Sequence, residues 1–311
     1  MSDDRDGTPV SGTIHGTVLG APFAFPPGQT LKVNSILVPP QPEDGVMLIK
    51  PDNLINGPVL ALWCTGDGTG HQRGSAFLVA PGVAVTAHHV IQDYEDKEGL
   101  LRADAELVAF GQQGGLGLTW IVRSIVTPEA GDVALLMMDL HTALPEDFSL
   151  YVFELGARLP RVGERGTVLG IRSNLPDGVN VLDDRSRHLG KLEAATIASS
   201  GPIIDLYPLG RPMIDTPCFS LEATALGGMS GGPVFDARGL VIGMISSSVA
   251  IEGGYVSTAS LLWQSLWFEI GPTWPSGFLG EKFRLRDVMF PPEADYVRTE
   301  GDGLVYVDRP D

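Results

Sequence analysis

The chain has 311 residues, of which 43% are hydrophobic and 19% are charged, and it carries a formal net charge of -17. This length allows substantial hydrophobic cores and excludes a mini-protein that depends on disulfides or metal for stability. The acidic charge disfavours phosphate-rich partners, so we expect no nucleic acid among the ligands. The 39 glycines and 24 prolines favour short strands separated by turns over long helices, and we expect an all-β fold.

The first 44 residues are interrupted repeatedly by proline, so we expect them to form an arm that wraps on the surface or is partly disordered. From Gly45 onward, short apolar runs alternate with turns, and their lengths suit strands. The first group comprises residues 46–50, 59–64, 75–79, 83–87, 105–110, 118–126 and 133–138. The second group follows a polar link near residues 155–163 and comprises residues 166–171, 191–199, 218–223, 233–236, 240–246 and 255–257. Two groups of about six strands predict paired barrels or sandwiches.

Residues 258–270 depart from the strand pattern, because their apolar positions follow helical spacing: Leu261, Leu262, Leu266, Trp267 and Ile270. We predict a helix there. The remaining residues contain a candidate hairpin, with strands at 295–299 and 304–307 around a Gly-rich turn.

The cysteines and the N-terminus bear on cofactors and location. Cys64 and Cys218 are far apart and in no spacing typical of a metal site, so we expect no disulfide framework and no metal, with one bridge or two free thiols left open. The acidic N-terminus lacks the features of a signal peptide, and no apolar run approaches the roughly 18 residues that span a bilayer. We therefore expect a cytoplasmic protein that does not bind membranes.

Three short segments carry residue types used in nucleophilic catalysis. One run ends in His88 and His89, Asp132 stands at the head of an apolar strand, and glycines surround Ser230. A serine hydroxyl needs a neutral imidazole to take its proton, and that imidazole needs a carboxylate to fix its tautomer. On chemistry alone, either histidine could be the base. The glycines allow the backbone N–H groups of Gly228 and Ser230 to face one point, which would hold an oxyanion.

In the order His, Asp, Ser, these segments resemble the trypsin/chymotrypsin-like serine peptidases. The resemblance covers about Gly45 to Ile270 and implies two antiparallel six-stranded β-barrels with a C-terminal helix. The family pattern Thr-Ala-X-His makes His89 the base, which leaves Asp132 to orient it and Ser230 to act as nucleophile. Ser246 lies in a segment similar to the family's strand beside the substrate and would support the aspartate. The resemblance thus implies a serine endopeptidase that acts on proteins or peptides and needs no cofactor.

The chain accordingly divides into three parts. Residues 1–44 form the N-terminal arm, residues 45–270 the peptidase domain and residues 271–311 a C-terminal extension. Within the domain, we expect the barrels at about 45–155 and 164–257 and the helix at 258–270.

Met229 marks a departure from the animal digestive enzymes, which carry an aspartate before the nucleophile to pair with a newly cut N-terminal amine. The chain also lacks their activation-site motif and the cysteines that bracket their catalytic histidine. It therefore looks more like bacterial members of the family that are synthesised in a competent form.

The specificity pocket is expected from the resemblance at Thr224, Ala225, Ser248 and Gly254. Thr224 stands where trypsin-type enzymes place an aspartate, and Ile245 stands where glutamate-specific relatives place a histidine. An unpaired cation in such a pocket would be costly, so a small or neutral residue is expected at P1, the substrate position before the scissile bond. An inward turn of Glu222 or Glu252 would instead admit a cation.

A second hypothesis is a catalytically silent trypsin-like fold that binds peptides or serves as a scaffold, or a protease that is active only with a regulatory protein partner. The Pro-rich arm and the acidic surface would then contact that partner. Met229 could allow the oxyanion loop to rest in an inactive turn until a ligand rearranges it.

Overall fold

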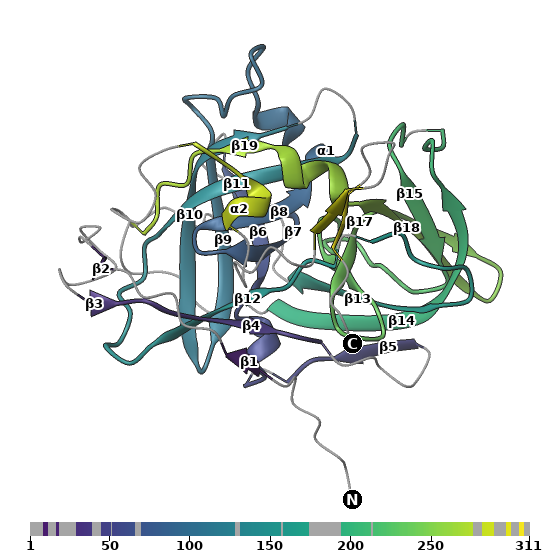
Figure 1. Cartoon of the computed structure of the whole chain (residues 1–311), viewed down its shortest axis with the longest axis horizontal. Helices are drawn as coiled ribbons and strands as arrows, with labels where there is room; N and C mark the ends of the chain where they lie inside the picture. Colours follow the sequence, from purple (N-terminus) through teal and green to yellow (C-terminus); the bar gives the residue numbers. More distant parts are fainter. Residues whose placement is uncertain are drawn as a thin grey trace, which may run out of the picture.

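The computed structural model describes residues 9–11, 17–18, 29–38, 45–50, 52–65, 70–127, 131–156, 158–173, 194–212, 214–275, 282–288, 297–299 and 305–307. Strands dominate this part of the chain, and its two α-helices, α1 (His88–Ile91) and α2 (Leu285–Val288), have four residues each (Figure 1).

The first barrel is built from strands that follow one another along the chain. They are β6 (Val59–Thr65), β7 (Gly70–Ala80), β8 (Val83–Ala87), β9 (Glu106–Gln113), β10 (Leu116–Val126) and β11 (Val133–Leu140). Their antiparallel pairing closes in the order β10-β11-β8-β7-β6-β9. β8 reads Val-Ala-Val-Thr-Ala and is buried along its whole length, as expected for a β-branched segment packed on both faces.

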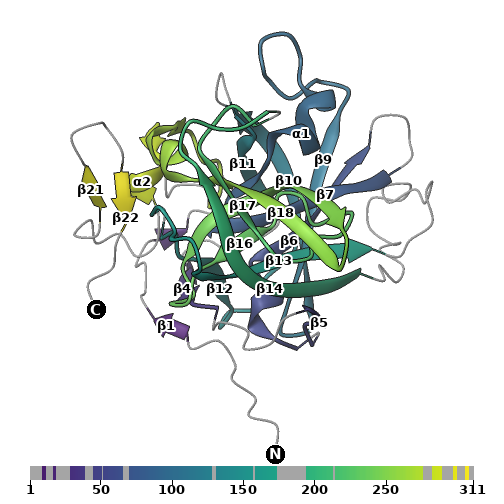
Figure 2. The same cartoon turned by 90° about the vertical axis from the view of Figure 1, so that its right-hand side faces the viewer.

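The second barrel lies beside the first and is drawn in green on the right of Figure 1. Its strands are β13 (Arg165–Ser173), β14 (Ala194–Tyr207), β15 (Cys218–Leu221), β16 (Pro233–Phe235), β17 (Val241–Ile251) and β18 (Gly254–Leu261). They form the ring β13-β16-β17-β18-β15-β14, which the antiparallel pairing of β13 with β14 closes. Figure 2 views the molecule from the side of this barrel. The expected all-β fold with two six-stranded antiparallel barrels is confirmed.

One strand expected in the first barrel belongs to the second. β5 (Gly45–Leu48) pairs with β14 and extends the second sheet to seven strands. The first barrel therefore begins at Val59, because the apolar run near Gly45 finds its hydrogen-bonding partners more than 140 positions later in the chain.

The small sheet β1-β4-β12, with β1 at Pro9–Ser11, lies on the side away from α1 (Figure 1), and β4 and β12 form a strap beside the barrels. β4 (Lys32–Ile36) runs parallel to β12 (Ser149–Phe153), which lies in the connection between the barrels. Leu31, Val33 and Ile36 are fully buried. This part of the expected surface arm is thus core structure, because it pairs with the linker strand β12 and its apolar residues belong to the hydrophobic core.

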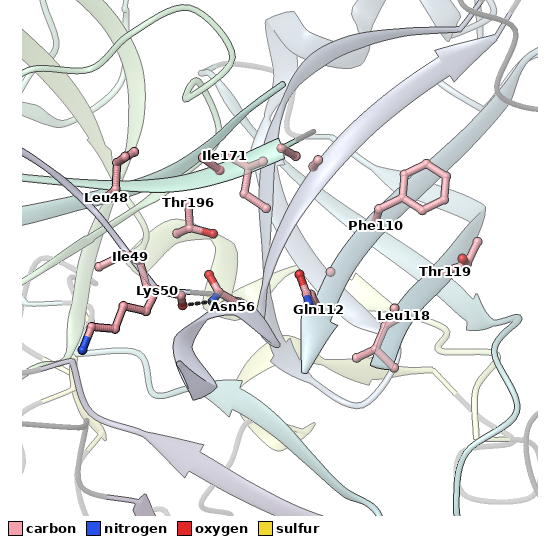
Figure 3. A pocket seen from close by; sticks show the side chains of 15 residues that line it. Leu48, Ile49, Lys50, Asn56, Phe110, Gln112, Leu118, Thr119, Ile171 and Thr196 are labelled. Atoms are coloured by element: carbon pink, nitrogen blue, oxygen red, sulfur yellow. Dashed lines mark hydrogen bonds between the residues drawn. The ribbon is translucent and has the colours of Figure 1, made fainter. Parts of the chain in front are cut away.

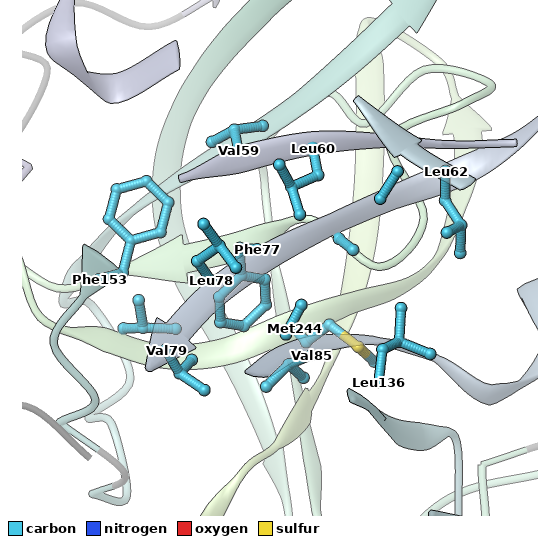
Figure 4. Close-up of a cluster of buried hydrophobic side chains, with 14 of the residues drawn as sticks. Val59, Leu60, Leu62, Phe77, Leu78, Val79, Val85, Leu136, Phe153 and Met244 are labelled. Carbon is cyan, nitrogen blue, oxygen red and sulfur yellow. The ribbon is translucent and has the colours of Figure 1, made fainter. Parts of the chain in front are cut away.

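Phe153 of the strap stands between the two barrel cores. Its ring contacts Phe77 of the first barrel, with centroids 6.4 Å apart, and Phe235 of the second barrel, 4.9 Å away in an edge-to-face arrangement. Figure 4 shows Phe153 beside Phe77, Val79 and Leu78. The apolar clusters of the barrels therefore merge into one continuous core.

The helix predicted for residues 258–270 is wrong. Residues up to Leu261 complete β18, which is hydrogen-bonded to β17 on one side and β15 on the other. A short 3-10 helix, η3 (Trp263–Trp267), and the two-residue strand β19 (Glu269–Ile270) follow. A strand end followed by a tight turn places apolar side chains three to four positions apart, which imitates helical spacing.

Several small elements complete the described structure. The hairpin predicted near the C-terminus is confirmed, with β21 (Val297–Thr299) paired antiparallel to β22 (Val305–Val307). The others are β1 (Pro9–Ser11), β2 (Thr17–Val18), β3 (Gln29–Thr30), β20 (Phe283–Arg284) and the 3-10 turns η1 (Leu54–Asn56) and η2 (Gln92–Tyr94). In the part of the chain described, no helix has the length and apolar character needed to cross a membrane.

Candidate active site

The histidine and the aspartate meet because β8 pairs with β11. The register sets Ala87 opposite Val133, so the residues that follow Ala87 lie beside the residue that precedes Val133. The backbone N–H of His89 donates to Oδ1 of Asp132 over 2.9 Å, and the ring Nδ1 lies 2.9 Å from both carboxylate oxygens. This contact requires a proton on Nδ1, which leaves Nε2 free to accept one.

His88, the other candidate base, turns to a different carboxylate. Its Nε2 lies 2.9 Å from Oε2 of Glu95, in the loop after α1. Its link to Asp132 is a backbone hydrogen bond, from the His88 N–H to the Asp132 carbonyl oxygen over 3.1 Å. Of the two rings, the structure brings His89 to Asp132.

Ser246 reaches the aspartate from the second barrel. Its hydroxyl donates a short hydrogen bond to Oδ2 of Asp132, and its side chain is buried in an irregular step of the β17–β18 pairing between Ile245 and Ser247. The carboxylate therefore receives donors from both barrels and is held between them, with only 14% of its side chain exposed.

The Ser230 loop is packed against the end of β8. The carbonyl oxygen of Ser230 accepts a hydrogen bond from the Ser75 N–H over 2.7 Å. Gly231, with φ +87°, lies so close that a Cβ there would stand 2.1 Å from the Ser75 carbonyl oxygen and 3.0 Å from the Ala87 nitrogen. Only glycine allows this approach, which sets Ser230 next to the segment that carries His89.

The oxyanion loop, residues 228–232, presents two amide groups that have no acceptor among the described residues. Among the described residues, the N–H groups of Met229, Gly231 and Gly232 donate to backbone carbonyls, whereas those of Gly228 and Ser230 donate to none. Gly228 has φ +95°, and its carbonyl oxygen accepts from Ser75 Oγ at 2.8 Å and Gln72 Nε2 at 3.3 Å. The Gly228 carbonyl is thus fixed from the first barrel.

Ser230 and His89 complete the group of catalytic residue types, both on described segments at the same end of β8. In the part of the chain that the structure describes, no hydrogen bond joins the Ser230 hydroxyl to the His89 ring. The Ser230 side chain is partly exposed, and 41% of the His89 side chain is open to solvent. Hydrogen bonds of this kind often tighten only when substrate binds.

Three of the four expected pocket residues lie together. Ser248 Oγ is 3.1 Å from Ser257 Oγ, which donates to the Ala223 carbonyl over 2.7 Å, next to Thr224 and Ala225. Gly254 instead lies at the tip of the β17–β18 hairpin, opposite Ile251, so its expected place in the pocket is not supported. Ser257 stands there, opposite Ser248. Glu222 and Glu252 are both exposed.

Ser257 was missed although the sequence contains a usable signal. A two-residue turn at Glu252 and Gly253 fixes the hairpin register, and counting outward from it pairs Ser248 with Ser257. Ser75 and Gln72 were also missed, and for them no local pattern exists, because their role depends on how one barrel sits against the other.

A comparison with protein families adds an independent finding to this geometry. The family model for the trypsin-like peptidase domain matches residues 74–244, more than half of the chain. The chain belongs to the trypsin-like peptidase family. This membership supports a peptidase of serine type with protein or peptide substrates, and the matched range contains His89, Asp132 and Ser230.

Three solved structures that are similar to this trypsin-like peptidase are distant from it in sequence. The MamO protease domain from Magnetospirillum magneticum is 14% identical and aligns over 67% of this chain and 94% of its own, with a TM-score of 0.46. An inactive serine-to-alanine variant of Rv3671c from M. tuberculosis H37Rv is 15% identical over 70% and 91%, with a TM-score of 0.40. Deg5 is 18% identical over 67% and 85%, with a TM-score of 0.46. No curated protein matches this chain.

Proposed function

We propose that this trypsin-like peptidase is a serine endopeptidase that acts through an acyl-enzyme, with Ser230 as nucleophile, His89 as acid and base, and Asp132 as the group that orients His89. The observation that carries the proposal is the contact of His89 Nδ1 with the Asp132 carboxylate at the end of β8, against which the Ser230 loop packs. A binding module has no need for this alignment of a base with a largely enclosed carboxylate.

The first half of the reaction forms the acyl-enzyme. Ser230 Oγ attacks the carbonyl carbon of the scissile bond while its proton passes to His89 Nε2, and the carbonyl π electrons move to oxygen. The N–H groups of Gly228 and Ser230, which donate to no described residue, would donate to this oxyanion. The tetrahedral intermediate then expels the amine, which takes the proton from His89, and leaves an ester on Ser230.

The second half repeats these steps with water in place of the hydroxyl. His89 takes a proton from the water as it attacks the ester carbonyl, and returns that proton to Ser230 Oγ as the acid product leaves. Asp132, held by Ser246, stabilises the imidazolium formed in both halves.

The oxyanion loop is supported by the packing of Met229, which carries no charge that could form an ion pair. Met229 is fully buried, and its backbone and side chain lie directly over Gly170 of β13, where any Cβ would come within 2.7 Å of Met229 Cβ. This fit supports a loop that adopts its shape on folding, without a cut that releases an N-terminal amine.

A small or neutral P1 residue is proposed from the pocket lining. Hydroxyl groups of Ser248 and Ser257 and the side chains of Thr224 and Ala225 offer no charge, and both nearby glutamates face solvent. Desolvating an unpaired cation or carboxylate at such a site is costly.

Labelling with a fluorophosphonate tests the assignment directly, because the reagent reacts only with an activated serine. We expect modification of Ser230 in the native chain and none in Ser230→Ala or His89→Ala. His88→Ala is the matched control and should keep labelling. Equal labelling of His89→Ala and His88→Ala would overturn the role of His89 as the base. Absence of labelling in the native chain under all conditions, including added peptides, would instead favour a peptide-binding protein without catalysis.

A further inference from the structure

A cavity of about 620 Å³ opens between the two barrels, and neither Ser230 nor His89 is among the described residues that line it. One wall is formed by Ala61 of β6, Phe110 of β9 and Thr119 of β10. The opposite wall is formed by Ile171 of β13 and Thr196 of β14, and Figure 3 shows these two side chains on the far side of the space from Phe110 and Thr119. Nothing in the proposed reaction uses this space.

The lining indicates the chemistry of a ligand. Apolar atoms make up most of the surface, and the apolar residues that line the cavity include Phe110, Ile171 and Ala61. Lys50 is the only charged residue among the described residues that line the cavity, and its amino group points away from the other labelled side chains in Figure 3. Asn56 Nδ2 is already engaged with the Lys50 carbonyl over 2.7 Å. Volume and lining fit a neutral, mainly apolar small molecule.

One wall connects the cavity to the oxyanion loop through a row of residues. In the antiparallel register Thr119 is opposite Phe110, Phe110 is opposite Ala61, and Ala61 is opposite Ser75. Directly opposed residues place their side chains on the same face of a sheet. The row therefore runs from the cavity to Ser75, whose hydroxyl donates to the Gly228 carbonyl over 2.8 Å.

The opposite wall, which contains Ile171, is also connected to the Gly228 carbonyl. The Ile171 N–H donates to Ser75 Oγ over 2.9 Å, and the Ile171 carbonyl accepts from Gln72 Nε2 over 2.6 Å. Gln72 Nε2 also lies 3.3 Å from the Gly228 carbonyl oxygen. The Ile171 side chain lines the cavity while its backbone anchors both groups that fix Gly228, so a shift of β13 would be felt at the oxyanion loop.

We propose that this cavity is a binding site for a neutral, mainly apolar small molecule, and that its occupation increases the reactivity of Ser230 by holding Ile171, Ser75 and Gly228 in the arrangement described. A ligand shifts such an equilibrium only if it binds one arrangement better than the other, and contact with Ile171 supplies that difference. The binding site is independent of the proposed function, and only its effect on Ser230 rests on it.

The binding site is tested with the neutral dye N-phenyl-1-naphthylamine, whose fluorescence rises in apolar surroundings. We expect saturable binding to the native chain and at least about tenfold weaker binding to Gly117→Phe. Gly117 lines the cavity two residues before Thr119, on the same side of β10, has ordinary φ, and has no atom within 4 Å of an added Cβ. Gly271→Phe, which also enters open space but lies outside the cavity, is the matched control.

Dye binding to Gly117→Phe as tight as to the native chain would overturn the site. If Gly117→Phe does not fold, Thr119→Phe on the same wall gives the same test, with the same two outcomes.

The effect on Ser230 is measured as the rate of fluorophosphonate labelling with and without saturating dye. We expect an increase of at least about fivefold in the native chain, and none in Ser75→Ala, which keeps the cavity but loses the hydroxyl that reaches Gly228. An unchanged rate in the native chain, with the dye bound, would overturn the coupling. If Ser230 fails to label at all, the proposed function fails, whereas the dye titrations still decide whether the site exists.

Discussion

Ala87 lies directly opposite Val133 in the pairing of β8 with β11, and this single register position brings a histidine and an aspartate that are 43 residues apart into contact. A shift of one residue would turn Asp132 to the other face of the sheet. The buried, β-branched sequence of β8 fixes the register and so fixes the alignment of the base.

Replacing Asp132 by asparagine, a side chain of nearly the same shape, tests how the carboxylate aligns His89. In Asp132→Asn the amide can donate to Nδ1, which favours the tautomer with the proton on Nε2 and prevents His89 from accepting the serine proton. We expect kcat to fall by about 10⁴. Ser246→Ala keeps the carboxylate but removes one donor, so a smaller loss of about tenfold to hundredfold is expected. The comparison is made by steady-state hydrolysis of a peptide substrate, and equal losses in the two variants would contradict the separate roles.

Gly231→Ala should prevent the Ser230 loop from closing on β8. The added Cβ would stand 2.1 Å from the Ser75 carbonyl oxygen at φ +87°, where side chains are strained in any case. We expect the free energy of unfolding to fall by at least about 2 kcal/mol, measured in urea, and labelling of Ser230 to be lost. Gly271→Ala, in open space, should change neither quantity. A fully stable and reactive Gly231→Ala would show that the loop is placed differently.

A carboxylate in the pocket should redirect specificity. Thr224→Asp introduces a negative charge next to Ala225 and close to Ser257, and a substrate with Arg or Lys at P1 would pair with it. We expect kcat/KM for such substrates to rise at least about tenfold relative to the native chain. The neutral variant Thr224→Asn should show no such gain. The measurement is a peptide series that differs only at P1, and no gain in Thr224→Asp would place the pocket elsewhere.

The Arg158 cluster predicts a large loss of stability from one substitution. Asp236 is fully buried, and its Oδ2 lies 2.8 Å from Nη2 of Arg158, which also pairs with Glu164. Arg158→Met would leave the buried carboxylate without its main partner, and we expect unfolding to become easier by about 3 to 5 kcal/mol in urea. Arg123→Met is the matched control, because the side chains of Arg123 and its partner Asp139 are 50% and 31% exposed and the pair should contribute about 1 kcal/mol or less.

Alkaline pH should destabilise the protein through Cys64. Burial raises the pKa of this thiol from 9.0 to about 12, so the folded chain keeps the proton that the unfolded chain releases above pH 9. The unfolded state then binds fewer protons than the folded state. The free energy of unfolding therefore falls as the pH rises from 9 to 12, by up to about 1.4 kcal/mol per pH unit. Cys64→Ala should flatten this dependence in urea titrations. An identical slope in both proteins would contradict the assignment.

The sequence predicted the strands well where they form barrels from neighbouring segments. The run at residues 83–87 matches β8 residue for residue, since a short buried strand bounded by turns leaves a clear local pattern. The site residues His89, Asp132 and Ser230 stood out by motif. Their proximity could not be derived from spacing, because it depends on register and on how the barrels meet.

The elements and residues that the sequence did not predict correctly all depend on contacts between distant parts of the chain. Residues 258–261 read as part of a helix, yet pairing on both sides draws them into β18. β4 was hidden among prolines, and its partner β12 lies more than 110 residues later. Ser75 and Gln72 act only through the opposite barrel, so no property of their own neighbourhood points to Gly228.

The strap limits how far this peptidase can be truncated from its N-terminus. A chain that starts at Gly45, the boundary suggested by motif and composition, would lose Leu31, Val33 and Ile36 and uncover the buried side chains of Leu150, Val152 and Phe153. It would also lose the hydrogen bond from the Val38 N–H to the Gly239 carbonyl, which ties the same segment to the second barrel. The smallest self-sufficient unit therefore includes a proline-rich stretch that alignment to the family alone would discard.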